Sequence, residues 1–287
     1  MLGHYQLFSD SDAPKFRVCR CVDMTFIPHM HHQYEFIYML QGEMETTVED
    51  ETCVLHPGDM ALSLSNKIHR YRSPEASLSC MVIFEPEQTA SFANLMKKRD
   101  FASPFFHDPA HKEELDQIAW ALLREAEQTG REPDPLVLKG YMTVFLGRIY
   151  QSAAFVPRSN SSSTLQMVLE YITAHFTEPL SLDTLAEDLN FSKYYLSRIF
   201  NQQLGYSFCH YLKYLRINHA LSLLDEDALA ISDISYECGF ESLRSFNRSF
   251  QEILGTNPTS YREARRKQKT EAADPDSIAV LEMPVSL

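Results

Sequence analysis

The sequence predicts an α+β protein of two domains, with an antiparallel β-barrel and accompanying helices first and an all-helical domain second. Three observations carry this prediction. Short apolar runs alternate with turn signals over residues 16–85, a Pro- and Ser-rich polar segment spans 157–163, and two similar helical segments follow it. A chain of 287 residues is long enough for two domains of roughly 100–200 residues each.

Composition narrows the classes of protein that this chain can represent. It carries 26 Lys and Arg against 39 Asp and Glu, a formal net charge of −13. This charge excludes a protein that coats nucleic acid through an overall positive surface, but it does not exclude a local basic face. A hydrophobic fraction of 44% excludes an entirely disordered chain. The sequence has no apolar run near the roughly 20 residues that cross a bilayer, and its first residues lack a secretory signal, so we expect a cytoplasmic protein.

The cysteines do not form a recognisable framework. Six of them stand at positions 19, 21, 53, 80, 209 and 238, with no CxxC pair among them. This spacing does not indicate a secreted disulfide scaffold. Cys19 and Cys21 lie in the strand-like run FRVCRCV, so we interpret them as small buried side chains rather than a metal or redox pair.

The β-rich part is predicted from short runs of β-branched, aromatic and other apolar residues. Beyond the run that holds the two cysteines, the expected strands are 34–40, 43–50, 59–64 and 76–84. Turn residues at 41–42, 56–59 and 73–74 separate them. Many short strands at this spacing predict a small antiparallel barrel or sandwich.

Two helices are expected after the strands, at 112–128 and 135–150, the second with Pro135 in its first turn. The first helix carries an apolar stripe at positions 115, 118, 119, 122 and 123. Two interpretations are open: the helices form a dimer interface, or their apolar stripes cover the barrel. We favour the dimer interface.

The C-terminal part contains an internal repeat. The segment LAEDLNFSKYYLSRIFNQQLGYSFCHYL (185–212) matches ISYECGFESLRSFNRSFQEILGTNPTSYR (234–262) in its apolar, Arg and Gly positions, at an offset of 49 and then of 50 after one insertion. Each copy is predicted to be helix, tight turn, helix. Asn190 and Gly239 fall at the equivalent turn position, and both residue types adopt positive φ readily. Ser181, Ser207 and Asn257 are the expected N-caps of three helices.

The second helix of each copy is predicted to bury one face and present the other to DNA. Apolar residues stand four apart at 196, 200 and 204, and again at 246, 250 and 254. The opposite faces hold side chains that reach base edges and phosphates: Lys193, Tyr194, Ser197 and Arg198 in the first copy, and Leu243, Arg244, Asn247 and Arg248 in the second. The alternative, two solvated amphipathic helices of an ordinary bundle, is disfavoured by the duplication.

The segment between the copies sets their separation. Residues 207–224 are expected to form one helix about 25 Å long. With the widths of the two units added, the recognition helices would stand about one DNA turn apart, roughly 34 Å, and would enter successive major grooves. Lys213 on this helix is a candidate phosphate contact. Residues 159–269 hold 11 basic and 13 acidic residues, so the chain's acidity lies mostly elsewhere.

The C-terminal segment resembles the AraC/XylS family of bacterial transcription regulators. ISDISYECGFESLRSFNRSFQEILGTNPTSYR is similar to the family signature, and SLDTLAEDLNFSKYYLSRIFNQQLG to its first helix-turn-helix. The resemblance covers about 165–265 and implies a seven-helix DNA-binding domain whose base contacts are made from both second helices. Leu243 departs from the polar residue often found at this position. A leucine side chain cannot hydrogen-bond a base edge, so the contact open to it is an apolar one with a thymine methyl group.

The family resemblance also implies the organisation and the partners. The expected divisions are a sensing and dimerisation domain at 1–156, a linker at 157–163, a DNA-binding domain at 164–267 and a flexible tail at 268–287. The implied partners are promoter DNA, a small-molecule effector, RNA polymerase and a second copy of the chain. The expected class is an activator, although the residues themselves do not set the direction of regulation.

The N-terminal part resembles the cupin fold. HMHHQYEFIYMLQG places His29, His31 and Glu35 at cupin spacing, and His69 follows a degraded second motif that keeps Pro57–Asp59. In metal cupins such residues bind a divalent ion. We expect these four residues to bind a polar organic effector, with a carbohydrate as the first candidate, and we expect no cofactor or metal. A bound metal and a purely structural role remain the alternatives.

Two functions from different classes follow. The favoured one is a ligand-responsive, sequence-specific transcription regulator that is not an enzyme. The alternative is a metal-dependent cupin enzyme fused to a DNA-binding domain, which requires a metal with an open coordination position.

Overall fold

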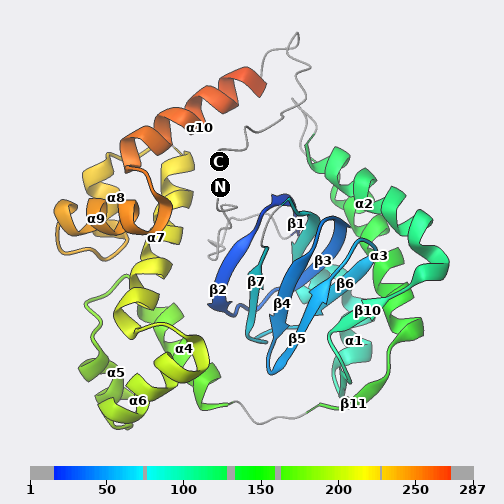
Figure 1. Ribbon diagram of the computed structural model, residues 1–287, viewed down its shortest axis with the longest axis horizontal. Coiled ribbons are helices and arrows are strands. Elements are labelled where there is room, and N and C mark those ends of the chain that lie inside the picture. Colours follow the sequence, from blue (N-terminus) through cyan, green and yellow to red (C-terminus); the bar gives the residue numbers. More distant parts are fainter. Residues whose placement is uncertain (1–15, 74–75, 128–132, 159–162, 227, 273–287) are drawn as a thin grey trace.

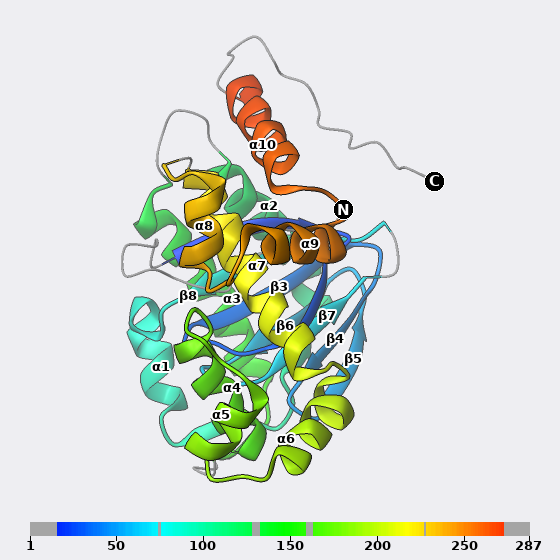
Figure 2. The same cartoon turned by 90° about the vertical axis from the view of Figure 1, so that its left-hand side faces the viewer.

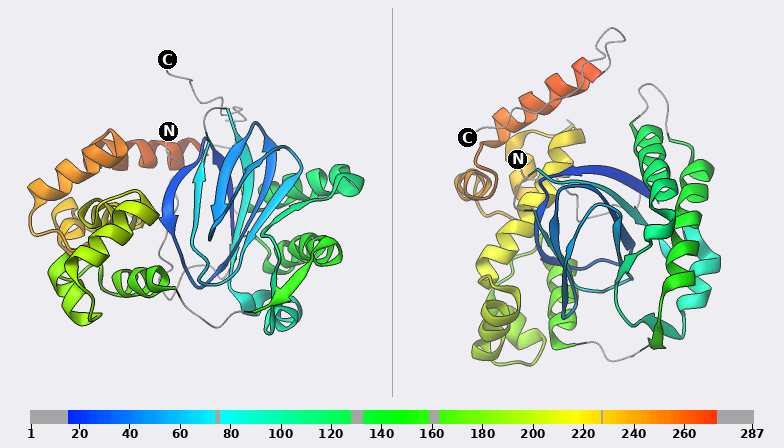
Figure 3. Two further views of the ribbon diagram at one scale, coloured as in Figure 1. Left: turned by 60° about the horizontal axis from the view of Figure 1, so that its bottom comes forward. Right: turned by 45° about the vertical axis from the view of Figure 1, so that its right-hand side comes forward.

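The computed structural model describes residues 16–73, 76–127, 133–158, 163–226 and 228–272. Its N-terminal half contains two facing antiparallel sheets with helices on one side, and its C-terminal half is helical (Figure 1). In two further views, the C-terminal helices and the helix pair α2 and α3 lie on opposite sides of the sheets (Figure 3). The α+β class predicted from the sequence is therefore confirmed.

The larger sheet has five strands in the order β1-β8-β3-β6-β10. Its strands are β1 (Phe16–Val22), β3 (Tyr34–Gln41), β6 (Asp59–Ser63), β8 (Leu78–Phe84) and β10 (Phe105–His107). The smaller sheet has the order β2-β7-β4-β5. Its strands are β2 (Thr25–His29), β4 (Met44–Val48), β5 (Glu51–Leu55) and β7 (His69–Arg72).

The barrel is not closed. Among the described residues, no strand of one sheet pairs with a strand of the other, so the fold is a sandwich-like open barrel. The segment expected as one strand at 43–50 ends at Val48 and turns through Glu49, whose φ is +54°, into β5. Strand β5 lacked an apolar signal because most of its side chains face solvent.

Strand β3 is buried on both faces because it lies at the centre of the larger sheet. Ile37 and Met39 point between the sheets, whereas Phe36 and Tyr38 point outward into a second core. Helices α2 (Lys112–Ala126) and α3 (Pro135–Ser152) supply the other side of that second core. Four residues of the α2 stripe, Leu115, Ala119, Leu122 and Leu123, are buried there. The structure thus uses this stripe to cover the sheet.

Short elements complete the N-terminal half. They are the 3₁₀ turns η1 (Pro86–Thr89) and η2 (Pro109–His111), the helix α1 (Ala90–Met96), and the strands β9 (Arg99–Phe101) and β11 (Phe155–Pro157). Pro157, the first residue of the expected linker, pairs with Arg99 in the small sheet β11-β9. Residues 159–162 of that linker lie outside the described residues.

Seven α-helices form the described C-terminal half. They are α4 (Thr164–His175), α5 (Leu182–Asp188), α6 (Lys193–Ile199), α7 (Phe208–Glu226), α8 (Ile231–Glu237), α9 (Leu243–Leu254) and α10 (Pro258–Ala272). A π-helical segment, η3 (Phe200–Leu204), extends α6. Helix α10 includes residues 268–272 of the segment expected to be a tail, and residues 273–287 lie outside the described part.

The expected turns and caps are confirmed. Asn190 and Gly239 have φ of +55° and +80°. The hydroxyl of Ser181 accepts from the Thr184 N–H in a capping box. The His210 N–H donates to the Ser207 hydroxyl over 3.2 Å, and the Ser260 N–H donates to Asn257 Oδ1 over 2.9 Å.

The two halves of the molecule are in contact through β2 and α7. The ring of Phe26 meets the ring of Tyr214 edge-on, with centroids 5.4 Å apart. At a second point, the Gln166 side chain on α4 donates to the Asn66 carbonyl over 3.1 Å. These contacts attach the start and the central helix of the C-terminal domain to the sheets.

Candidate functional site

Helix α6 separates a buried face from an exposed face. Leu196 and Ile199 are buried in the core. Lys193, Tyr194 and Arg198 are exposed, with Tyr194 80% accessible. Ser197 is half-buried. Ser192 is the N-cap of the helix, and its hydroxyl accepts from the Tyr195 N–H over 3.2 Å.

Helix α9 repeats this division. Phe246 and Phe250 are fully buried, and Ser249 joins them. The residues proposed to face DNA are exposed: Leu243, Arg244, Asn247 and Arg248. Ser242 is the N-cap, so both second helices start with the same local chemistry. In Figure 2, α6 and α9 lie near opposite ends of α7 and on the same side of it.

The second turn is fixed by space as well as by backbone conformation. A Cβ atom on Gly239 would lie 2.4 Å from the Thr177 carbonyl oxygen. The turn is closed by hydrogen bonds from the Gly239 N–H to the Tyr236 carbonyl, 2.8 Å, and from the Phe240 N–H to the Ser235 carbonyl, 3.0 Å. Glycine is therefore required here, whereas Asn190 serves in the first unit.

The basic residues between the two units are already engaged within the protein. Lys213 Nζ lies 3.4 Å from Glu252 Oε2 on α9. The Arg216 guanidinium donates to the carbonyls of Phe176 and Glu178, over 2.7 and 2.8 Å. Arg216 thus ties the end of α4 to α7, and Arg198, Arg244 and Arg248 offer more exposed cationic groups.

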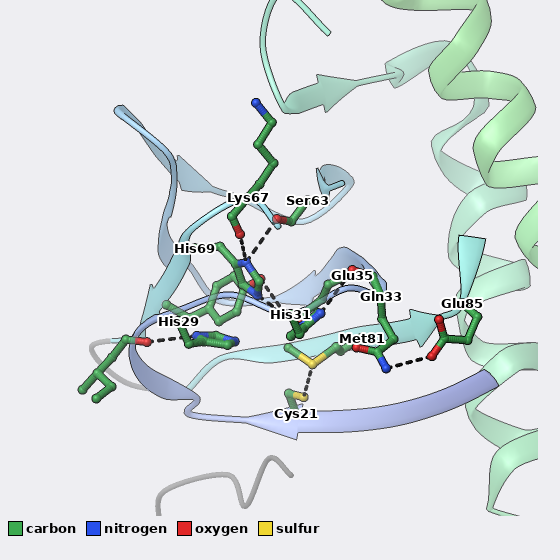
Figure 4. A network of polar contacts seen from close by, with 12 residues as sticks. Cys21, His29, His31, Gln33, Glu35, Ser63, Lys67, His69, Met81 and Glu85 are labelled. Atoms are coloured by element: carbon green, nitrogen blue, oxygen red, sulfur yellow. Dashed lines mark hydrogen bonds and ion pairs between the residues drawn. The ribbon is translucent and has the colours of Figure 1, made fainter. Parts of the chain in front are cut away.

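The four candidate effector residues do come together. His29 ends β2, Glu35 lies on β3 and His69 begins β7, while His31 lies in the connection before β3. One ligand atom from each lies within 4.8 Å of the others. The side chains of His31, His69 and Glu35 are 7%, 1% and 0% exposed, so the cluster lies inside the sandwich (Figure 4).

Backbone carbonyls orient all three imidazoles. Nδ1 of His29 donates to the Ile27 carbonyl over 3.0 Å, and Nδ1 of His31 to the Gln33 carbonyl over 3.1 Å. Nδ1 of His69 donates to the Lys67 carbonyl over 2.8 Å. A carbonyl oxygen can only accept, so each of these bonds places a proton on Nδ1.

The carboxylate of Glu35 is held from both ends. The Tyr71 hydroxyl donates to Oε1 over 2.5 Å, and His31 Nε2 lies 3.1 Å from Oε2. Burial opposes ionisation of this group, but the imidazoles of His69 and His31 outweigh it and hold the pKa of Glu35 well below its usual range. Burial, with help from His69, lowers the pKa of His29, and burial beside Glu35 raises the pKa of Tyr71.

The cluster adjoins the contact between the two halves. The ring of Phe26 lies against the ring of His29, with centroids 4.5 Å apart, and its other neighbour is Tyr214 on α7. A path of two ring contacts therefore joins the cluster to the long helix. Phe26, Tyr71 and Tyr214 were not predicted from the sequence, because aromatic residues in a strand or a helix carry no signal beyond core packing.

These features define a class of protein: a ligand-binding sandwich joined to a double helix-turn-helix domain. Residues 22–146 match the AraC-like ligand binding domain, and residues 185–264 match a helix-turn-helix domain. The chain belongs to the AraC/XylS family of transcription regulators. Its relatives and both domains are those of regulators, so the chain is a transcription regulator and not an enzyme.

The chain is similar to regulators from several bacteria. It is 28% identical to the uncharacterized HTH-type transcriptional regulator YfiF of Bacillus subtilis over 85% of this chain and 81% of the relative. It is 26% identical to the HTH-type transcriptional activator RhaR of Escherichia coli O1:K1 over 83% of this chain and 87% of the relative. A Staphylococcus aureus regulator, 28% identical over 78% of this chain, is longer, and the match spans 31% of its length.

A solved structure has the same fold. An apo point variant of ToxT from Vibrio cholerae strain SCE256 has a TM-score of 0.53 at 15% identity, over 87% of this chain and 97% of the ToxT chain. The likeness supports the arrangement of a sheet domain followed by a helical domain. Among the described helices, none combines the length and the apolar character that spanning a membrane demands.

Proposed function

We propose that the protein binds promoter DNA with α6 and α9 in successive major grooves of one duplex, and that an effector in the N-terminal domain changes this binding. The observation that carries the proposal is the duplicated division of α6 and α9 into a buried apolar face and an exposed polar face. Their common side relative to α7 supports engagement of one duplex (Figure 2).

Each candidate DNA-contacting side chain has a proposed role. Arg198, Arg244 and Arg248 are placed to bond guanine edges, and Asn247 to bond adenine. Tyr194, Ser197 and Leu243 add contacts with base edges or with a thymine methyl, and Lys193 contacts phosphate. Lys213 contacts phosphate after its ion pair with Glu252 breaks, so the cost of breaking that pair reduces the contribution of Lys213 to DNA affinity.

For the effector we propose a small polar molecule that engages His29, His31, Glu35 and His69, with sugars and related metabolites as the first panel to test. Its signal would pass through Phe26 to Tyr214, because this pair joins the cluster to α7. Regulation requires that the effector bind the DNA-competent and the incompetent arrangements with different affinities.

We further propose a homodimer that acts in the cytoplasm as an activator, in contact with RNA polymerase. The face of α2 that covers the sheet is unavailable for dimerisation, which leaves the outer face of α3. Leu136, Val137 and Val144 there are 79%, 37% and 36% exposed. Light scattering of the full chain checks this: Val144→Asp should give the monomer mass, whereas a monomeric wild type at micromolar concentration would remove the dimer.

Selection of bound sequences from a random DNA pool tests the central proposal. The full chain should enrich a site with two short conserved segments about one helical turn apart. Repeating the selection with the metabolite panel identifies the effector as the compound that changes recovery. Recovery of one short segment, or of no segment, would contradict reading by both helices.

A further inference from the structure

We infer that the loop at 64–68, between β6 and β7, couples the effector cluster to the first helix of the DNA-binding domain, and that Gln166 on α4 is the latch that joins them. The effector cluster consists of His29, His31, Glu35 and His69. The inference rests on the proposed function for its regulatory consequence, because it names a hydrogen-bonded route from the effector to the helical domain beside the ring contacts of Phe26. The coupling itself is measured on the chain without DNA or effector.

One side of the loop is bonded to the effector cluster. The Asn66 N–H donates to the His31 carbonyl over 2.9 Å. Nδ1 of His69 donates to the Lys67 carbonyl over 2.8 Å, as Figure 4 shows. The loop turns at Asn66, whose φ of +62° is a conformation that asparagine adopts readily. A displacement of His31 or His69 therefore moves the backbone of the loop directly.

The other side of the loop is bonded to α4. The Gln166 side-chain amide donates to the Asn66 carbonyl over 3.1 Å. The same amide nitrogen lies 3.5 Å from both carboxylate oxygens of Glu49, and one of these oxygens accepts from the Ile68 N–H over 2.6 Å. Asn66 thus bonds the effector cluster through its N–H and α4 through its carbonyl, so one residue of the loop connects the two domains.

Gln166 uses both ends of its side-chain amide. Its Oε1 accepts from the Ser163 N–H over 2.8 Å, and its own N–H donates to the Ser163 hydroxyl over 3.1 Å, which makes the capping box of α4. The oxygen therefore starts the helix while the nitrogen holds the loop. A glutamate at this position keeps the capping box and cannot donate to Asn66, so the two roles are separable by mutation.

Helix α4 transmits a displacement of its first turn. Val168, Leu169 and Ile172 are fully buried on its core side. Just beyond its other end, Arg216 on α7 donates to two backbone carbonyls. A helix that is packed along one face and held at its far end moves as a unit, so it carries the displacement to α7, which separates α6 and α9. The neutral hydrogen bonds of the latch are weak beside this core packing, so the latch opens without unfolding the helix.

Hydrogen exchange of the full chain, followed by peptide mass spectrometry, tests the coupling from both ends. At the latch, Gln166→Glu should speed amide exchange of residues 64–68 by about 2- to 30-fold, because the loop loses its donor and gains a like charge beside Glu49. Adding Glu49→Gln should slow this exchange again, since the new amide can donate to the carboxylate at position 166.

At the effector cluster, His69→Phe keeps a ring but loses the hydrogen bond to Lys67. It should speed exchange in the first turn of α4 by a similar factor, although the loop stands between residue 69 and that helix. The matched control is His107→Phe, which removes an exposed imidazole bonded to Asp59 and should leave exchange unchanged in the loop and in α4.

The reverse measurement decides where His69→Phe fails to fold, because coupling between two sites is reciprocal. With ¹⁵N-labelled histidine, Gln166→Glu should shift the imidazole resonances of His69 and leave those of His107 in place. Unchanged His69 resonances, unchanged exchange in α4, equal effects of the control, or no rescue by Glu49→Gln overturns the latch. Absence of coupling in a chain that still enriches an operator would refute the latch and leave the regulator standing, whereas coupling in a chain that enriches no DNA would refute the regulator alone.

Discussion

Gly239→Ala is expected to destabilise the C-terminal domain more than the same change at Gly205 or Gly255. All three glycines have positive φ, +80°, +76° and +68°. An alanine in this region costs about 1–2 kcal/mol. At Gly205 and Gly255 the new Cβ meets nothing within 4 Å, whereas at Gly239 it meets the Thr177 carbonyl oxygen at 2.4 Å.

The clash adds to the backbone cost at Gly239 alone. Overpacking against atoms that must shift costs about 1–3 kcal/mol, and here the obstructing atom belongs to the backbone. We therefore expect a loss of about 2–5 kcal/mol for Gly239→Ala and about 1–2 kcal/mol for each control. The loss should also weaken operator binding, since this turn sets the position of α9.

Urea unfolding of the three variants, followed by far-UV circular dichroism, measures the difference. All three glycines lie in the same helical domain, so the same transition reports on each. An unfolding free energy for Gly239→Ala within about 0.5 kcal/mol of the two controls would refute the reasoning. It would mean that the loop carrying Thr177 moves aside without cost.

Three further predictions concern other parts of the chain. Arg198→Ala and Arg248→Ala should each weaken operator binding by about 1–3 kcal/mol and relax specificity in one half of the site, measured by fluorescence anisotropy. An equal loss of affinity for random DNA would show that the arginine only neutralises phosphate charge on the DNA backbone. Asn190→Val should destabilise the protein because a β-branched residue is strained at φ of +55°, whereas Asn190→Gly should not. Differential scanning calorimetry measures the difference, and equal melting temperatures for the two variants would contradict this prediction. Burial raises the pKa of Cys19 to about 11, so at pH 8 its thiolate is scarce and iodoacetamide should modify the exposed Cys209 first, as peptide mass spectrometry will show. As the pH rises toward that pKa the thiolate becomes abundant, so labelling of Cys19 should increase steeply above pH 10. Fast labelling of Cys19 at pH 8 would contradict the raised pKa.

The helical domain was predictable because its signals are local. Asn190 and Gly239 mark turns, Ser181 and Ser207 mark helix starts, and the apolar residues recur every fourth position. Duplication then supplied an internal check, since each feature appears twice at nearly constant offset. None of these inferences required knowledge of distant contacts.

The features that could not be predicted from the sequence depend on tertiary contacts between residues that lie far apart along the chain. Strand β7 contributes His69 and Tyr71 to the interior from a short, polar run that does not look like a buried strand. The stripe on α2 is equally suited to a dimer and to a sheet, and only its packing shows that it covers the sheet. The Phe26–Tyr214 contact joins residues of two domains and leaves no trace in local periodicity.

Hydroxyl-radical footprinting of the selected operator with wild type, Arg198→Ala and Arg248→Ala tests most directly whether one chain reads two adjacent turns of DNA. We expect two protected segments per protomer about 10 base pairs apart, with each variant weakening a different one. A single protected segment, or two segments that fade together in both variants, would contradict reading by both helices.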